Sequence, residues 1–144
     1  MDIDILNFQK VKKLNISRLR GMIKKILSAL KISPKKVSFV FCDNRFIVKL
    51  NKKYFGLKNP TDVISFPIED EPGEYLGEAV ISVEEAVLAG QRQGCDWEKE
   101  LILYVIHGVL HLLGYDDIKL LDRKVMNNKQ VKLFTLVFPL GKNQ

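Results

Sequence analysis

Leu101-Ile-Leu-Tyr-Val-Ile-His107-Gly-Val-Leu-His111-Leu-Leu113-Gly-Tyr-Asp-Asp117 is the stretch of sequence that decides the fold. Residues 101–113 are apolar on nearly every side of a helix, which predicts a helix buried at the centre of the molecule. Gly114 ends this helix. Both histidines of the chain lie in it, and their spacing of four residues projects them from one helix face, one turn apart.

The sequence on either side of this helix predicts short strands and amphipathic helices. Strands are predicted at residues 2–8, 36–42, 62–67 and 76–82. A helix is predicted over residues 16–31, and a second follows a cap at Asp43. A third runs from the capping-box sequence Ser82-Val-Glu-Glu85 to Gly94. Asp96 caps the histidine helix, and a last helix begins at about Ile118. The order β-α-β-α-β-β-α-α-α predicts an α+β fold, with a small mixed sheet covered by helices and the histidine helix at its centre.

Length and composition are those of one domain that spans residues 1–144. Of the 144 residues, 47% are hydrophobic, which is enough for one core. Because no secretory signal is recognisable and no apolar run is long enough to span a bilayer, we expect a soluble cytoplasmic protein without a membrane partner. Cys42 and Cys95 belong to no CxxC pair and are expected to be buried free thiols, with a disulfide between them as the alternative.

The net charge of +6 is distributed unevenly along the chain. Residues 1–60 hold 15 Lys and Arg against 3 Asp and Glu, whereas residues 61–100 hold 2 against 11. A basic half beside an acidic middle indicates one face for a polyanion such as nucleic acid. The alternative is a set of solvated helix faces followed by an acidic loop.

His107, His111 and Asp117 form a predicted three-ligand site for a divalent metal ion. The turn at Gly114 brings a carboxylate back toward two imidazoles that share a helix face. Zinc in catalytic sites typically has three protein ligands and one open position for water. The structural alternative is a pair of core histidines whose nitrogen atoms are hydrogen-bonded to backbone carbonyls.

The spacing H-x-x-x-H-x-x-G-x-x-D is that of the metzincin zinc peptidases, with two differences. Gly108 stands where those enzymes have the glutamate that acts as general base. Asp117 stands where they have a third histidine, and a carboxylate there is accepted by zinc but shifts the preference toward harder ions. The base must therefore come from elsewhere, and the acidic candidates are Asp116, Glu78 and Asp62.

Three blocks of sequence add to this pattern. They are Leu50-Asn51-x-x-Tyr54-x-Gly56 with Pro60-Thr61-Asp62-Val63-Ile64-Ser65-Phe66-Pro67, then Leu76-Gly77-Glu78-x-Val80-Ile81-Ser82, and last His107-Gly-x-Leu-His111-Leu-x-Gly114-Tyr115-Asp116. In order and spacing these blocks resemble the YbeY family of bacterial endoribonucleases, also described as rRNA maturation factors. The resemblance covers essentially the whole chain, and a triple match of this kind is highly specific.

The resemblance implies an α+β domain with a zinc-like ion in a cleft. It also implies single-strand-specific cleavage of RNA in the maturation of small-subunit ribosomal RNA and in ribosome quality control. RNA and the small ribosomal subunit are then the expected partners, and DNA is not expected. By position, the resemblance makes His107 and His111 metal ligands.

The chain departs from the family pattern at several positions. The third ligand position, usually His, is Asp117, and the Arg that the family has after the tyrosine of the first block is Phe55. The family's Asp of the second block is Glu78, which keeps the charge. The acidic positions of the last helix are Asn127 and Gln130. These departures characterise a divergent member.

The residues suggest how RNA would be bound and cut. A metal ion held by His107, His111 and Asp117 would polarise a phosphodiester oxygen or ionise a bound water. The predicted catalytic residues are His107, His111, Asp116 and Glu78, and the predicted RNA-binding residues are Lys49, Lys52, Lys53 and Lys58. Tyr54 or Phe55 is a candidate for stacking an unpaired base, with packing on the apolar helix face as the favoured alternative for Tyr54.

Three functions from different classes follow from these patterns. The first is a metal-dependent endoribonuclease, which the three blocks and the basic half favour. The second is a metallopeptidase, which the ligand spacing favours and Gly108 opposes. The third is a non-catalytic ribosome assembly factor with a structural metal, which Phe55 and Asp117 favour.

Overall fold

The computed structural model of the chain describes residues 2–34, 36–68, 75–116 and 118–140. The elements in chain order are β1 (Asp2–Phe8), α1 (Ile16–Ala29), β2 (Lys36–Cys42), α2 (Asn44–Phe55), β3 (Val63–Pro67), β4 (Tyr75–Ser82), α3 (Val83–Gln93), α4 (Trp97–Leu112) and α5 (Leu120–Val137). This is the predicted order, and where a bound differs from the prediction it does so by a residue or two.

The strands form one mixed sheet in the order β1-β2-β4-β3. Strands β1, β2 and β4 run parallel to one another, whereas β3 pairs antiparallel with β4 and forms one edge. The α+β prediction with a small mixed sheet is therefore confirmed.

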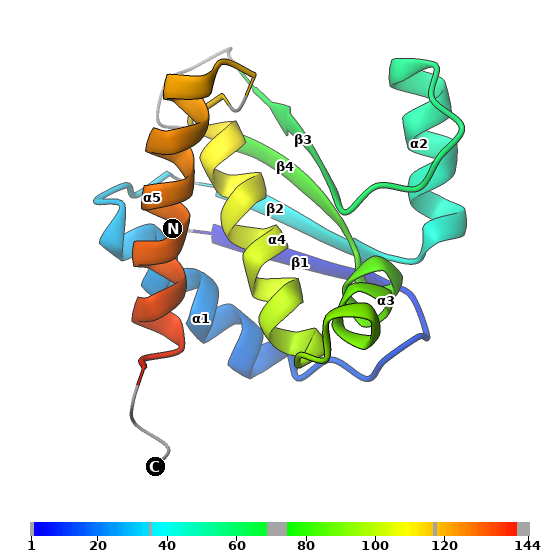
Figure 1. Ribbon diagram of the computed structural model, residues 1–144, viewed down its shortest axis with the longest axis horizontal. Helices are drawn as coiled ribbons and strands as arrows, with labels where there is room; N and C mark the ends of the chain where they lie inside the picture. The colour runs from blue at the N-terminus through cyan, green and yellow to red at the C-terminus, as the bar shows by residue number, and fades with distance from the viewer. Residues whose placement is uncertain (1, 35, 69–74, 117, 141–144) are drawn as a thin grey trace.

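Alternation of side chains along the strands gives the sheet two apolar faces. One face, which carries Phe39 and Ala79, packs against α1, α4 and α5 in the larger core. The opposite face, which carries Val40 and Val80, packs against α2 around Ile47 in a smaller core. Figure 1 shows α2 standing apart from α1, α4 and α5.

Helix α4, the predicted central helix, lies within the larger core. Its buried residues are Leu101, Ile102, Val105, Ile106, Gly108, Val109, Leu110 and Leu112. At its start, Asp96 accepts a hydrogen bond from the Glu98 backbone N at 3.1 Å. After its end, Gly114 has a φ of 94°, a left-handed conformation that glycine adopts without strain. The residues that bound the histidine helix are thus the ones that the sequence predicts.

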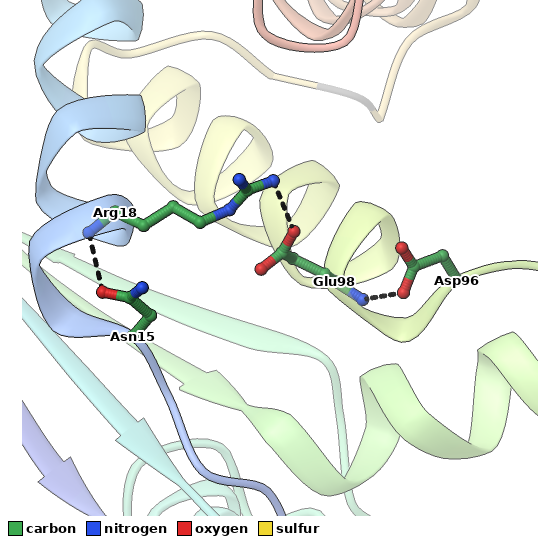
Figure 2. A network of polar contacts seen from close by, with 4 residues as sticks. All are labelled: Asn15, Arg18, Asp96 and Glu98. Atoms are coloured by element: carbon green, nitrogen blue, oxygen red, sulfur yellow. Dashed lines mark hydrogen bonds and ion pairs between the residues drawn. The ribbon is translucent and has the colours of Figure 1, made fainter. Parts of the chain in front are cut away.

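A polar contact joins the starts of α1 and α4 (Figure 2). Asn15 caps α1 by accepting a hydrogen bond from the Arg18 backbone N at 3.1 Å. The Arg18 guanidinium then donates to Glu98 Oε1 at 2.9 Å. Because Arg18 is exposed and Glu98 is only half-buried, we expect this ion pair to contribute only about 0–1 kcal/mol to stability.

Helix α5 is less amphipathic than the other helices. Met126 and Leu133 are buried against the core, whereas Leu121 and Val125 are exposed. Apolar residues therefore lie on more than one side of this helix. None of the helices in the described ranges combines the length and the apolar character that crossing a lipid bilayer requires.

Two local predictions are wrong in part. Ser82 caps α3 by accepting from the Glu85 backbone N at 3.1 Å, but the Glu85 carboxylate does not complete a capping box. It accepts from Asn44 Nδ2 at 2.8 Å instead and ties α3 to the start of α2. Cys42 is a buried free thiol as predicted, whereas Cys95 is a free thiol exposed in the turn before α4.

Candidate functional site

His107 and His111 lie on neighbouring turns of α4 with their rings close to each other. Their Nε2 atoms are 2.9 Å apart, and their ring centroids are 4.5 Å apart with an angle of 70° between the planes. Both side chains are half-buried. The predicted projection from one helix face is confirmed, and the two Nε2 atoms lie within hydrogen-bond distance of each other.

Gln130 of α5 contacts the other nitrogen of His107. The Nδ1 atom of His107 donates to Gln130 Oε1 at 2.6 Å. A neutral imidazole with its proton on Nδ1 presents a lone pair at Nε2, which is the tautomer that a metal ion bound at Nε2 requires. Gln130 therefore fixes both the orientation and the tautomer of this ring.

Gly108, between the two histidines, faces the sheet. A Cβ atom at this position would lie 3.0 Å from Val63 Cγ2 and 3.1 Å from Ala79 Cβ. The absence of a side chain therefore lets α4 approach β3 and β4 closely. Ser65 Oγ donates to the Gly108 carbonyl at 2.9 Å and fixes the helix to β3. A side chain at position 108 would crowd Val63 and Ala79, which counts against a metzincin-like general base.

A cavity of about 410 Å³ opens beside His111, and we call it the histidine cleft. It is lined by Asn51, Phe55, Thr61, Val63, Ile64, Ser65 and His111. Asn51 is buried, and its Nδ2 donates to the Asn59 carbonyl at 2.8 Å, which fixes the loop after α2. The first sequence block thus meets the histidine block across this cleft.

The acidic residues predicted as general bases occupy three different places. Asp116 is exposed beyond the end of α4, where its Oδ1 accepts from the Ile118 backbone N at 2.9 Å. Asp62 accepts from the Val63 backbone N at 2.7 Å at the start of β3. Glu78 lies in a separate pocket on the α2 side of the sheet. The structure therefore does not bring Glu78 to the histidines.

Asp117, the predicted third ligand, lies outside the described residues. Among the residues that the structure describes, no group of three or more His, Cys, Asp or Glu side chains is close enough to share a metal ion. The geometry of the two histidines still fits zinc. Two nitrogen ligands of a tetrahedral zinc ion lie roughly 3.3 Å apart. The His107 and His111 Nε2 atoms are 2.9 Å apart, at hydrogen-bond distance, so zinc binding would need a small ring rotation and loss of the proton between them.

The basic and aromatic residues predicted to bind RNA lie on α2 and in the loop after it. Lys49, Lys52, Lys53 and Lys58 are all exposed. Phe55 is exposed at the rim of the histidine cleft. Tyr54 contacts Phe66 edge-on, with ring centroids 5.1 Å apart, but 53% of it remains exposed. Packing therefore accounts for only part of the Tyr54 surface.

Sequence reasoning missed the contact between His107 and Gln130. The two residues are 23 positions apart in sequence and on different helices. A signal was present, because Gln130 lies at helical spacing between the apolar residues Met126 and Leu133, both buried in the structure. A polar residue on the buried side of a helix needs a partner, and here the partner is a histidine.

Comparisons with known proteins agree on one family. The sequence model of the endoribonuclease YbeY family matches residues 4–137. The endoribonuclease YbeY of Endomicrobium trichonymphae is 35% identical over 137 residues, which cover 95% of this chain and 96% of that protein. The endoribonuclease YbeY of Syntrophus aciditrophicus is 34% identical over 151 residues, with coverage of 97% and 93%.

The fold is also similar to a solved structure. The solution structure of TM1509 from Thermotoga maritima superposes with a TM-score of 0.69 at 29% sequence identity. The similar region covers 94% of this chain and 89% of that protein. The similarity in sequence and in fold therefore extends over nearly the whole chain.

Proposed function

Because the chain belongs to the endoribonuclease YbeY family, we propose that it cleaves single-stranded RNA at the histidine cleft with the help of a divalent metal ion. The resemblance predicted from the three sequence blocks is confirmed, and with it the nuclease class of hydrolase. The metal ion is proposed to be zinc, held by His107, His111 and Asp117. The choice of zinc and of Asp117 as the third ligand is based on the chemistry of the donor atoms.

The observation that carries the proposal is the convergence of the two Nε2 atoms beside an open cleft. They are 2.9 Å apart, and His111 lines a cavity of about 410 Å³. A bound zinc ion would supply Lewis-acid polarisation of a phosphodiester oxygen and make water a stronger nucleophile. Gln130 would keep the His107 Nε2 lone pair directed at the metal position, because Gln130 Oε1 accepts a hydrogen bond from the Nδ1–H group of the same ring.

The remaining roles are assigned by position. Asp116 is the proposed general base, since its exposed carboxylate directly follows the turn at Gly114. The exposed lysines of α2 and its following loop, Lys49, Lys52, Lys53 and Lys58, are proposed to bind RNA phosphates. Glu78 has no role in the chemical step of this proposal, because it lies in a different pocket.

We further propose that the RNA is ribosomal. The proposed role is maturation of small-subunit ribosomal RNA and ribosome quality control in the cytoplasm, with the small ribosomal subunit as partner. The basic first sixty residues support a polyanionic partner. Two free cysteines fit a reducing compartment.

Two other functions that the sequence pattern allows have weaker support. A metallopeptidase has the same ligand spacing, but the space beside Gly108 is filled by Val63 and Ala79. An assembly factor with a structural metal is favoured by Phe55 and Asp117, the positions where the chain departs from its family.

One set of incubations separates these functions. The purified protein is incubated with labelled single-stranded RNA, with duplex RNA or with casein, each with and without zinc. We expect zinc-dependent cleavage of single-stranded RNA alone. His111→Ala should abolish it, whereas Asn128→Ala, at an exposed position of α5, should not. Cleavage of casein alone would establish the peptidase instead, and RNA binding without cleavage would establish the assembly factor.

A further inference from the structure

A second cavity, which we call the tyrosine pocket, lies between α2 and its side of the sheet. Its volume is about 350 Å³, and it is lined by Phe46, Leu50, Tyr54, Phe66, Ile68, Tyr75 and Glu78. Small-molecule sites are typically about 300–1,000 Å³, mainly apolar, with a few polar groups that fix orientation. Among the described residues of the lining, aromatic rings dominate and Glu78 is the charged group.

A β-bulge brings Tyr75 into this pocket. Lys36 of β2 pairs with Tyr75, and the next pair on the same side of β2 joins Ser38 to Glu78, so β4 has one extra residue between them. With simple alternation Tyr75 and Glu78 would point to opposite faces of the sheet, and the extra residue turns both to the same face. The Ser38 and Tyr75 hydroxyl oxygens are 2.9 Å apart, which fixes the position of the ring.

Glu78 lies on β4, which is flanked by β2 and β3, and faces the α2 side of the sheet. It pairs in register with Ser38 on β2 and with Phe66 on β3, and its side chain is half-buried. Within the described part of the chain, its carboxylate has no hydrogen bond or ion pair. A carboxylate has only acceptor atoms, so a ligand that fits beside it needs N–H or O–H donors.

Positive charges lie beside both tyrosines of the pocket. Lys53 Nζ is 5.3 Å from the centroid of the Tyr54 ring, and Lys36 Nζ is 5.2 Å from that of Tyr75. Lys36 also contacts Asp4 at 3.4 Å, so among the described residues Lys53 is the cation with fewer competing contacts. Lysines at the border of an aromatic pocket suit a ligand that has a flat ring and a phosphate.

We propose that the tyrosine pocket binds a guanine base of single-stranded RNA, an inference that rests on the proposed function. The aromatic rings stack the base. The Glu78 carboxylate accepts hydrogen bonds from N1–H and N2–H, two donors that lie side by side on the Watson–Crick edge of guanine and of no other RNA base. Lys53 contacts the adjacent phosphate.

The tyrosine pocket and the histidine cleft are neighbours along α2. Leu50 and Tyr54 line the tyrosine pocket, and the residues that directly follow them, Asn51 and Phe55, line the histidine cleft. Strand β3, at the edge of the sheet, contributes to both cavities. An RNA strand that crosses this edge reaches both, so the pocket would favour guanine near the cleaved bond.

An NMR titration tests this inference. The full-length, isotope-labelled protein is titrated with GMP and, separately, with IMP, and binding is measured from the chemical shifts. IMP is GMP without the 2-amino group and therefore lacks one of the two donors. We expect GMP to bind about tenfold more tightly than IMP, with the largest shifts at Tyr54, Phe66, Tyr75 and Glu78. Neither mononucleotide has an internal phosphodiester bond, so the result is independent of whether the chain cleaves RNA.

Substitutions test whether the preference for GMP over IMP depends on the residues of the tyrosine pocket. Glu78→Gln should weaken GMP binding to the level of IMP, and Tyr54→Ala should weaken both by at least about fivefold. The matched control Glu98→Gln, which changes a carboxylate on α4 (Figure 2), should keep the preference for GMP. Equal affinities for GMP and IMP in the wild type, or an unchanged preference in Glu78→Gln, would overturn the inference while leaving the nuclease proposal intact.

Discussion

The Nδ1 atom of His107 on α4 lies 2.6 Å from Oε1 of Gln130 on α5, a residue 23 positions further along the chain. This contact links the proposed metal ligand to a helix that contributes no ligand itself. Gln130 is a neutral acceptor, so it fixes the ring without adding a negative charge behind it. Residues that hydrogen-bond to a metal-binding histidine generally tune the affinity for the metal.

Gln130→Ala is therefore expected to weaken zinc binding by about 10-fold or more. Gln130→Glu keeps an acceptor atom at the same distance along the side chain, so this variant should retain most of the wild-type affinity for zinc. Competition with a chromophoric chelator measures the zinc dissociation constant, and Asn128→Ala on the same helix is the control. Identical constants for wild type and Gln130→Ala would show that the contact does not position a ligand.

Gly108 is expected to be required for stability because of its contacts with the sheet. Gly108→Ala places a Cβ 3.0 Å from Val63 Cγ2 and 3.1 Å from Ala79 Cβ, and overpacking of this kind costs about 1–3 kcal/mol. Gly21→Ala is the matched control, since nothing lies within 4 Å of a Cβ there, and it should stabilise helix α1 by up to about 1 kcal/mol. Urea unfolding measures both, and equal destabilisation by the two substitutions would contradict the packing account.

The lysines of α2 and its loop are expected to bind RNA through phosphates and not through bases. Lys52→Ala should reduce the slope of the logarithm of RNA affinity against the logarithm of salt concentration by about 0.7, the value for one phosphate contact on a single strand. Fluorescence anisotropy over a range of salt concentrations measures this slope. Lys24→Ala, at an exposed position on α1, should leave the slope unchanged, and a loss of equal size in Lys24→Ala would mean that the RNA follows another surface.

The two cysteines are expected to differ strongly in reactivity. Burial, together with the nearby charge of Asp43, raises the pKa of the Cys42 thiol to about 12. Desolvation and the Glu100 carboxylate also raise the pKa of the Cys95 thiol, but Cys95 is exposed to the reagent. At about pH 8 the Cys42 thiol is therefore both protonated and enclosed, and the thiolate is the reactive form. A thiol reagent that absorbs on reaction should label Cys95 in the native protein and Cys42 only after unfolding. Rapid labelling of both would show that the Cys42 site opens readily.

The helix boundaries could be predicted from the sequence because they depend on local chemistry. Asp43 and Asp96 accept hydrogen bonds from backbone N–H groups two or three residues further on, and Gly114 adopts a left-handed conformation. Each of these features needs only the residue and its near neighbours in sequence. The central position of α4 could be predicted from one segment as well, because residues 101–113 are apolar on nearly every side of the helix.

The parts of the site that depend on distant residues could not be predicted in this way. The role of Gln130 depends on how α5 packs against α4, which no short segment specifies. The position of Glu78 depends on strand register, because residues 78–82 of β4 face the α2 side and the α4 side alternately, and no short segment specifies which residues face which side. From the sequence, Glu78 is a candidate base because it is acidic and lies near the end of an apolar strand, and the register places its side chain in the tyrosine pocket.

The central claim is that RNA cleavage requires a metal ion held by the histidines of α4. The most direct test measures the rate of single-stranded RNA cleavage by the wild-type protein after treatment with EDTA and again after the return of one equivalent of zinc. We predict that the rate falls to background after EDTA and recovers with zinc, and that His111→Ala stays at background under both conditions. Full activity of the metal-free protein would contradict the claim.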